Sequence, residues 1–543
     1  MKKKKSFVGG AMILGAVGIL IKVLGAAFRI PLGNIIGDDG MGYYQTAYPI
    51  YVLFLTIATA GIPTAVSRMV AERYAQDKPY EAYRVFRTSS KLLFATGLIS
   101  ASILFFGAGA ITSFIKEPDA IYCMRAIAPA LIFVPLMGSY RGFFQGRQDM
   151  RPTAISQFVE QFFRVAFGLS LTVILLDKGL PVAAAGASSG ATFGGLFGFI
   201  AILFIYLKNK KNIDAEISTI SHEAEESSSS IIKTIIMIAV PITIGASIMP
   251  IITSIDTVVV KSRLMTLGYS SDEARALYGQ LTGMAQPIIN LPQVLTQAVS
   301  MSLVPVIASS YKRGDSEFMK ENIVLSIRYA MIVAMPCAFG MMFRAGPIMK
   351  LLYPRQPEAA LGASNCLEIL AIGVVFLSIV HATTGTLQGI GKQHVPVINL
   401  CIGAVCKVFL TIALTGVQAL NIRGAAIGTV FAYGMAAALN LLAVKRYTGV
   451  TVSFNTAYRK PIEESFAMGF VAVMLNWILV NYTPIDSRIA CLLGVFAGAA
   501  VYVFRLFNAK LISIEELEDM EDVASSRLVR LLIKIYDKFA SDK

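Results

Sequence analysis

The sequence predicts an all-α integral membrane protein of about 14 transmembrane helices, arranged as two pseudo-symmetric six-helix lobes plus two extra C-terminal helices. Three observations lead to this prediction: the composition, a series of apolar runs and an internal repeat. Of the 543 residues, 55% are hydrophobic and 15% are charged, whereas soluble domains carry about 25% charged residues. A water-soluble multidomain protein is therefore excluded, because such domains could not bury this much apolar surface.

Fourteen apolar runs are long enough to cross the hydrocarbon core, which takes about 20 residues of helix. An even number of spans places both chain ends on one side of the membrane. The predicted spans are 7–32, 47–66, 90–115, 121–140, 154–176, 181–206, 232–260, 276–307, 322–344, 362–387, 395–419, 422–444, 461–482 and 486–507.

The positions of Lys and Arg predict the orientation. With Met1 in the cytoplasm, and with basic residues near the span ends assigned to the adjoining segments, 33 of the 48 basic residues fall in cytoplasmic segments and 10 in external ones. The other five lie within spans and are Lys22, Arg29, Arg125, Arg164 and Lys407. This is the positive-inside pattern, so both termini are predicted to be cytoplasmic. The net charge of +14 indicates anionic membrane lipids, and not nucleic acid, as the partner. The external loops 261–275 and 344–355 are exceptions, because each carries three basic residues.

An internal repeat predicts the domain organisation. Gln145-Gly146 and Arg164 recur 243 residues later as Gln388-Gly389 and Lys407. The repeat is parallel because six spans separate its copies, and such proteins bind substrates between their halves. We predict lobes at 1–207 and 232–444, a cytoplasmic linker at 208–231, spans 13 and 14 within 445–507, and a cytoplasmic amphipathic tail at 508–543. The tail is predicted to lie on the anionic inner leaflet, and a helix packed on the protein is the alternative.

The sequence contains no catalytic constellation. The three histidines lack metal-ligand spacing, and the six cysteines form no CxxC pair. We therefore predict a transporter and not an enzyme, with no catalytic and no metal-binding residues. Asp38 and Asp39 lie in the Gly-rich segment GDDGMG, which favours a turn.

Charged residues within the spans are the candidate binding residues, because such groups are costly in lipid and usually face a cavity or a partner. Lys22 and Arg29 stand almost two helical turns apart on the first span, so both point to one face, about 10 Å apart. No acidic residue shares that span. Two such cations suit a diphosphate, whose oxygens Arg binds with two parallel hydrogen bonds. Snorkelling to the membrane interface is the alternative.

Four further residues complete the predicted substrate-binding set. Glu160 and Arg164 stand four residues apart on the fifth span, where they form either a self-neutralising pair or part of a cavity wall. Lys407 has no local acid, and Asp256 is its candidate partner. Span arithmetic places Asp256 about 15 Å nearer the outside, so their contact requires a helix break. A Lys held near an Asp would mimic or replace a coupling cation.

Three segments carry a resemblance to a known family. They are GMGYYQTAYPIYVLFLTIATAGIPTAVSRMVAE (40–72), RGFFQGRQDMRPTAISQFVEQFFR (141–164) and YGQLTGMAQPIINLPQVLTQAVSMSLVPVIASSY (278–311). These segments resemble the polysaccharide-flippase branch of the multidrug/oligosaccharidyl-lipid/polysaccharide exporter superfamily. They are similar to its SpoVB/YtgP group, which is related to the MurJ-like lipid II flippases. The likeness covers the first twelve spans.

The resemblance implies alternating access that carries a lipid-linked cell-wall precursor such as lipid II outward across a bacterial plasma membrane. It assigns Lys22 and Arg29, in KVLGAAFR, to positions that meet the diphosphate. The family's arginines on the second and eighth spans have no counterpart here. The implied partners are a polyprenyl-diphosphate-linked sugar, anionic lipids, and proteins of cell-wall synthesis or division. We expect a monomer without a cofactor, and the drive (Na⁺, H⁺ or the membrane potential) stays open.

Several other functions remain alternatives at this point. One is a flippase for a teichoic-acid, capsule or spore-cortex precursor. Another is a cation-coupled drug exporter. A membrane glycan transferase would need an essential external carboxylate, and a non-transporting scaffold would need no cavity.

Overall fold

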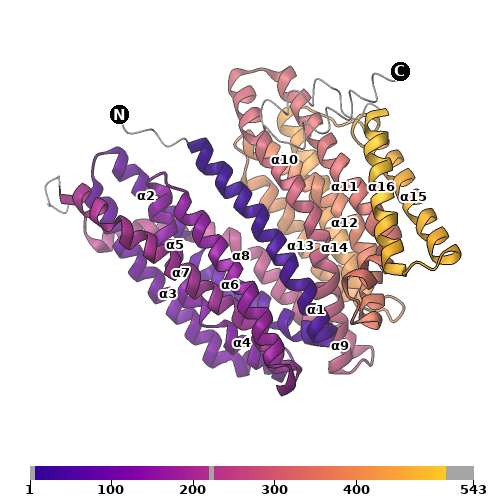
Figure 1. Cartoon of the computed structure of the whole chain (residues 1–543). Helices are drawn as coiled ribbons and strands as arrows, with labels where there is room; N and C mark the ends of the chain where they lie inside the picture. The colour runs from indigo at the N-terminus through magenta and orange to yellow at the C-terminus, as the bar shows by residue number, and fades with distance from the viewer. Residues whose placement is uncertain (1–6, 219–225, 509–543) are drawn as a thin grey trace. The chain divides into compact units, whose positions relative to one another are not determined.

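The computed structural model describes residues 7–218 and 226–508, and nearly all of them are helical. Helices follow from the apolar spans, because a backbone inside a bilayer must satisfy its own hydrogen bonds. The described ranges contain no β-strand. The helices labelled in Figure 1 and the short elements between them are α1 (Phe7–Thr59), α2 (Ile62–Ala75), α3 (Pro79–Phe114), η1 (Pro118–Ala120), α4 (Ile121–Ile127), α5 (Ala130–Gly146), α6 (Arg151–Ile174), η2 (Leu176–Lys178), α7 (Leu180–Ser218), α8 (Ser228–Thr266), α9 (Ser271–Tyr278), η3 (Gly279–Ala285), α10 (Gln286–Arg313), α11 (Ser316–Leu352), α12 (Pro357–Gly389), α13 (His394–Thr415), α14 (Ile422–Thr448), η4 (Asn455–Arg459), α15 (Lys460–Tyr482) and α16 (Ser487–Asn508).

All fourteen predicted spans fall largely on helical segments, which confirms the predicted fold class. Twelve stretches of the described residues are long and apolar enough to cross a membrane. The first of these, Leu20–Ala75, contains the second predicted span and the second half of the first. Helix α6, the fifth predicted span, is not among the twelve because Glu160, Arg164 and neighbouring glutamines lower its mean hydropathy.

The chain turns back on itself within α1, at Gly37. Gly37 has φ 67° and ψ −170°, a conformation that residues with a Cβ atom avoid. On a straight helix Phe28 and Tyr44 would stand about 24 Å apart along the axis, but their ring centroids are 6.0 Å apart. The loop expected between the first two spans is therefore replaced by a turn at a single glycine.

Helix also continues into much of the predicted linker. Helix α7 ends at Ser218 and α8 begins at Ser228, so most of the described part of 208–231 is helical. Glu216, near the end of α7, accepts hydrogen bonds from Arg147 and from the Tyr74 hydroxyl. Nearly all of the predicted tail at 508–543 lies outside the described residues.

The contacts divide the chain into two compact units. The apolar core of the first contains Leu32, Tyr51 and Leu104, and a core cluster of the second contains Ile307, Ile323 and Leu387. The predicted lobes remain a prediction. The first unit consists of the described residues of Met1–Val294, Leu352–Cys366 and Leu400–Ala432, and the second of those of Leu295–Leu351, Leu367–Asn399 and Tyr433–Lys543.

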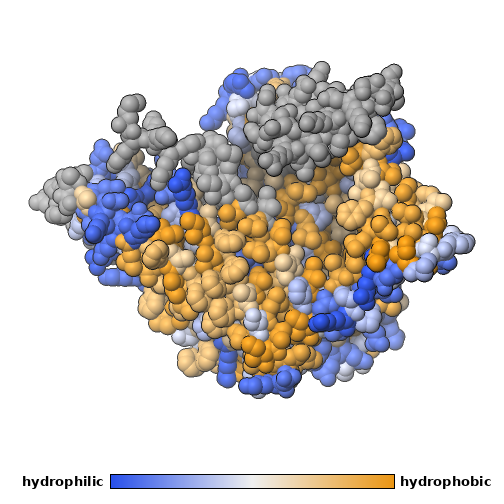
Figure 2. All heavy atoms as spheres, viewed as in Figure 1, coloured by the Kyte–Doolittle hydropathy of each residue, from blue (hydrophilic) through white to orange (hydrophobic). Residues whose placement is uncertain are grey.

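The outer faces of many helices carry large exposed apolar side chains, such as Phe106 and Phe114 on α3, Phe204 on α7 and Phe496 on α16. Figure 2 shows apolar residues over the middle of the helices and hydrophilic ones toward their ends. Helices with an apolar middle and hydrophilic ends are expected where a chain is in contact with lipid.

Candidate functional site

Three cations surround one hollow in the first unit. Lys22 and Arg29 of α1 and Arg164 of α6 line a cavity of about 450 Å³, together with Gln161, Asn290 and other residues. No Asp or Glu stands among the described residues that line it. We call it the cationic hollow. Its size and its convergent charges suit a small anionic group.

The turn at Gly37 positions Arg29. The guanidinium carbon of Arg29 lies 5.9 Å from the centre of the Tyr48 ring. Tyr48 belongs to the half of α1 that follows Gly37. Tyr44, Tyr48 and Tyr51 form a row there, with successive ring centroids 5.5 and 6.0 Å apart. This contact holds Arg29 beside the hollow, because a cation is attracted to the face of an aromatic ring.

Arg164 belongs to a second charge cluster that also includes Arg141. The Glu160 carboxylate lies 3.3 Å from Arg164 and 3.0 Å from Arg141. Two guanidinium groups share one carboxylate, so the cluster keeps a net positive charge. The predicted pairing of Glu160 with Arg164 is therefore present, and Arg164 also lines the hollow.

Glycines of α7 allow this cluster to pack tightly. Gly190, Gly194 and Gly198 stand four residues apart and so lie on one helix face. A Cβ atom on Gly194 would stand 2.5 Å from the Glu160 carbonyl oxygen, and one on Gly190 would stand 2.5 Å from the Arg164 carbonyl oxygen. Only glycine therefore allows α7 to lie this close to α6.

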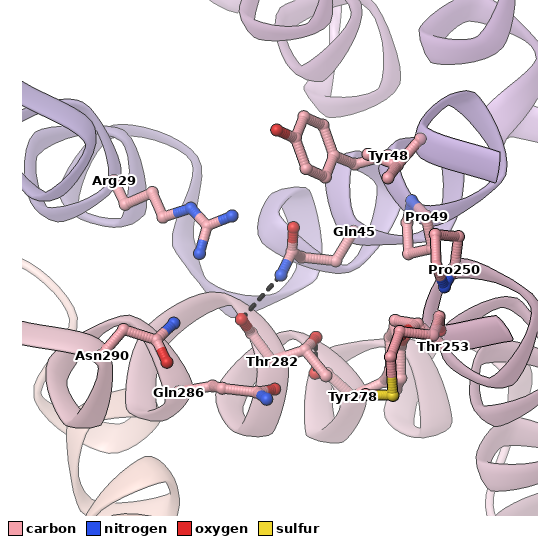
Figure 3. Close-up of a pocket in the computed structure, with 12 residues that line it drawn as sticks. Arg29, Gln45, Tyr48, Pro49, Pro250, Thr253, Tyr278, Thr282, Gln286 and Asn290 are labelled. Atoms are coloured by element: carbon pink, nitrogen blue, oxygen red, sulfur yellow. Dashed lines mark hydrogen bonds between the residues drawn. The ribbon is translucent and has the colours of Figure 1, made fainter. Parts of the chain in front are cut away.

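A second cavity of about 330 Å³ adjoins the first, since Arg29, Tyr48 and Asn290 line both. Its other polar lining residues are uncharged and include Gln45, Thr253, Thr282 and Gln286. Figure 3 shows Arg29, Gln45 and Asn290 extending toward the same space. We call it the amide hollow. Sequence reasoning missed it, because glutamine and asparagine within apolar runs carry no periodic signal.

Asp256 and Lys407 lie elsewhere in the first unit and line neither hollow. They form an ion pair between α8 and α13, and Asp256 is 6% exposed. The predicted separation of about 15 Å was wrong. Helix α8 has 39 residues, or about 58 Å, so its ends extend beyond the hydrocarbon core and depth cannot be counted from the predicted span limits.

A buried ionic network joins α1, the segment before η1, α8 and α9. Glu117 lies 3.3 Å from Lys261 and 3.0 Å from Arg275, and Arg275 lies 2.6 Å from Asp39. Glu117, Lys261 and Arg275 are all 5% exposed or less. The excess of basic residues in loop 261–275 thus has a physical explanation: two of them are neutralised inside the protein.

Asp38 and Asp39, the two acidic residues of the segment GDDGMG, both make tertiary contacts. Asp39 pairs with Arg275, and Asp38 accepts a hydrogen bond of 2.7 Å from the Gln280 amide.

Within 7–218 and 226–508 there is no group of three or more His, Cys, Asp or Glu side chains placed to hold a metal. The chemistry that these hollows support is binding of a charged and hydroxyl-rich group.

Comparison with known protein families shows which family the chain belongs to. Residues 7–311 match the polysaccharide biosynthesis protein family, and residues 281–413 match the MatE family. The chain belongs to the polysaccharide biosynthesis protein family. This membership confirms the resemblance drawn from the three sequence segments and identifies a multi-pass membrane protein.

Relatives in the family match over nearly their whole length. The lipid II flippase MurJ of Bacillus subtilis (strain 168) is 28% identical over 91% of this chain and 94% of the relative. Stage V sporulation protein B of the same organism is 25% identical over 95% of this chain and 97% of the relative.

Solved structures share the fold. A lipid II flippase MurJ in an inward closed conformation has a TM-score of 0.69 and 16% identity, over 92% of this chain and 100% of that one. An inward-facing multidrug resistance MATE family transporter of the MOP superfamily has a TM-score of 0.62 and 16% identity, over 79% of this chain and 94% of that one. This chain therefore shares its all-α fold with both of these proteins.

Proposed function

We propose that the protein flips an undecaprenyl-diphosphate-linked peptidoglycan precursor, lipid II, from the inner to the outer leaflet by alternating access. The observation that carries the proposal is the cationic hollow, where Lys22, Arg29 and Arg164 converge and no lining residue is acidic. A diphosphate is the part of a lipid-linked sugar that these cations would bind. The relation to a lipid II flippase at 28% identity supports the same substrate.

The cost of moving a charged head group across the membrane explains why such a protein needs a hollow lined with cations. Moving an ionised diphosphate through hydrocarbon is prohibitive, because charge is very poorly solvated there. Cations in a polar hollow replace part of the lost hydration. A membrane potential that is negative inside drives an anion outward by about 2.3 kcal/mol per charge at 100 mV. This drive agrees with an outward flip that consumes no bound cofactor.

The proposal includes the orientation and setting of the protein. The protein lies in a bacterial plasma membrane with both termini in the cytoplasm. The excess of basic residues in the segments between spans on that side favours this orientation. The chain acts as a monomer and contacts anionic lipids. Lys22 and Arg29 bind the substrate, and Asp256 with Lys407 acts outside the hollows, as a fixed internal ion pair.

Paired substitution of the two α1 cations tests the binding site. We expect Lys22→Ala with Arg29→Ala to reduce the external exposure of labelled lipid II about tenfold or more in cells whose native flippase is shut off, because each lost charge-assisted hydrogen bond is worth about 1.5–3 kcal/mol. Lys210→Ala with Lys211→Ala removes two exposed charges from α7 and serves as the matched control. Undiminished exposure in the first variant at equal protein level would reject the cationic site.

Growth rescue tests the substrate itself. Expression of the protein in cells depleted of their lipid II flippase should restore growth. Rescue of a teichoic-acid, capsule or spore-cortex flippase defect without rescue of the lipid II defect would reject lipid II as the substrate. Sequence similarity to a stage V sporulation protein makes the spore-cortex precursor the first alternative to test.

A further inference from the structure

The amide hollow lies beside the cationic hollow but offers different chemistry. Apart from Arg29, its lining residues carry no charge, and three of them are carboxamides: Gln45, Gln286 and Asn290. A carboxamide both donates and accepts hydrogen bonds, as hydroxyl and acetamido groups do. The hollow is therefore suited to a neutral polar group that is linked to the anion beside it.

The Gln45 amide has a fixed orientation. Its Nε2 donates a hydrogen bond of 2.6 Å to the Thr282 carbonyl oxygen (Figure 3). A carbonyl can only accept, so the nitrogen of Gln45 must face Thr282 and its oxygen must face away.

The backbone around Thr282 explains why its carbonyl takes a bond from a side chain. Residues Gly279–Ala285 form the π-helix η3, and the Gln286 N–H accordingly donates to the Leu281 carbonyl, five residues back. In this register the Thr282 carbonyl would take its bond from residue 287. That residue is proline, which has no N–H. Gln45 supplies a donor in its place.

The fixed amide presents an acceptor without a donor. Gln45 is 7% exposed, and its Oε1 is buried with no hydrogen-bond partner in the described part of the chain. Burial of an unsatisfied carbonyl oxygen costs free energy, so this position favours a ligand that brings a hydroxyl or an N–H group.

Asn290 offers the complementary group. Gln293 donates a hydrogen bond of 3.1 Å to Oδ1 of Asn290. The Nδ2 group of Asn290 is therefore the part left to donate, and in Figure 3 it points toward Arg29. An acceptor on Gln45 and a donor on Asn290 match the N–H and C=O of an acetamido group, or a pair of sugar hydroxyls.

We infer that the amide hollow binds the sugar next to the diphosphate, with Gln45 accepting from and Asn290 donating to its hydroxyl or acetamido groups. This inference rests on the proposed function and adds a specificity site to it. A cationic drug does not fit, because no lining residue of either hollow is acidic. An isoprenoid tail does not fit, because it would leave the carboxamides without hydrogen-bond partners.

The test compares the binding of two lipids by the purified full-length chain. One probe is polyprenyl diphosphate, and the other is polyprenyl diphosphate linked to an N-acetylated disaccharide. We expect the wild type to bind the glycosylated probe about tenfold more tightly. Gln45→Leu and Asn290→Leu should each remove this preference. Gln45 lines the amide hollow and not the cationic one, so Gln45→Leu should also leave the affinity for the bare diphosphate unchanged. Gln418→Leu, in an exposed turn between α13 and α14, is the matched control.

The outcomes separate the two hypotheses. Asn290→Leu leaves the bond from Gln45 to Thr282 intact, so it reports on the hollow even where Gln45→Leu destabilises η3. Retention of the wild-type preference in Asn290→Leu, or an equal loss of affinity for both probes, overturns the sugar site. Failure of the wild type to bind either probe rejects the proposed function instead.

Discussion

Glu117 neutralises two buried cations, and we expect its removal to cost the protein much of its stability. It holds two buried cations, with 3.3 Å to Lys261 and 3.0 Å to Arg275. Glu117→Gln keeps the size of the side chain and removes its charge. Arg275 retains Asp39 and Asp272, but Lys261, which is 2% exposed, loses the carboxylate that neutralises it.

The loss follows from the burial of Lys261. Removing one partner of a buried ion pair costs about 3–5 kcal/mol, because the remaining charge stays in a poorly solvating interior. Replacing both partners with neutral side chains of similar size is far less costly. We therefore expect Glu117→Gln to lower the free energy of unfolding by about 3–5 kcal/mol and Glu117→Gln with Lys261→Met to recover most of it.

Equilibrium unfolding in mixed detergent micelles measures both effects. Glu358→Gln, at an exposed position in the first turn of α12, serves as the control and should leave stability unchanged within about 0.5 kcal/mol. The reasoning is refuted if Glu117→Gln matches the wild type. It is equally refuted if the double variant loses as much as the two single variants together, because the pair would then carry no coupling.

Two further predictions concern packing and the second ion pair. Gly194→Ala should lower the free energy of unfolding by about 1–3 kcal/mol, because the new methyl group would lie 2.5 Å from the Glu160 carbonyl oxygen. Gly107→Ala is the control and should raise the thermal midpoint slightly, because there is open space around Gly107. A shift of the same sign in both variants would contradict the packing argument. Lys407→Met should cost roughly 3 kcal/mol by leaving the Asp256 carboxylate without its ion pair. Adding Asp256→Asn should restore most of the loss in a denaturation series, and an additive loss would show that the two residues do not interact.

Much of the fold could be predicted from local pattern. Apolar runs of about 20 residues become helices in a bilayer whatever their tertiary neighbours, which is why each of the fourteen predicted spans is largely helical. Lys22, Arg29 and Arg164 could be selected for the same reason, because an ionised side chain within such a run needs a polar environment.

Other features needed information that is not local. The return at Gly37 required one backbone angle, and the network of Glu117, Lys261 and Arg275 joins residues that lie more than 140 positions apart. Sequence reasoning placed Lys261 and Arg275 in the external loop 261–275, outside the predicted spans. Their burial depends on how several helices meet, and no periodicity within one helix encodes that.

By itself, the sequence determined that the protein is a helical membrane protein and which of its helices carry cations within apolar runs, because hydropathy and charge act within each span. The tertiary structure alone decided which cations share a cavity and which are neutralised. Lys22, Arg29 and Arg164 converge on the cationic hollow, whereas Lys407 is held by Asp256. The physical reason is that the electrostatic energy of a charged side chain depends mainly on the groups within a few ångströms of it. In the folded protein these groups come from distant parts of the chain.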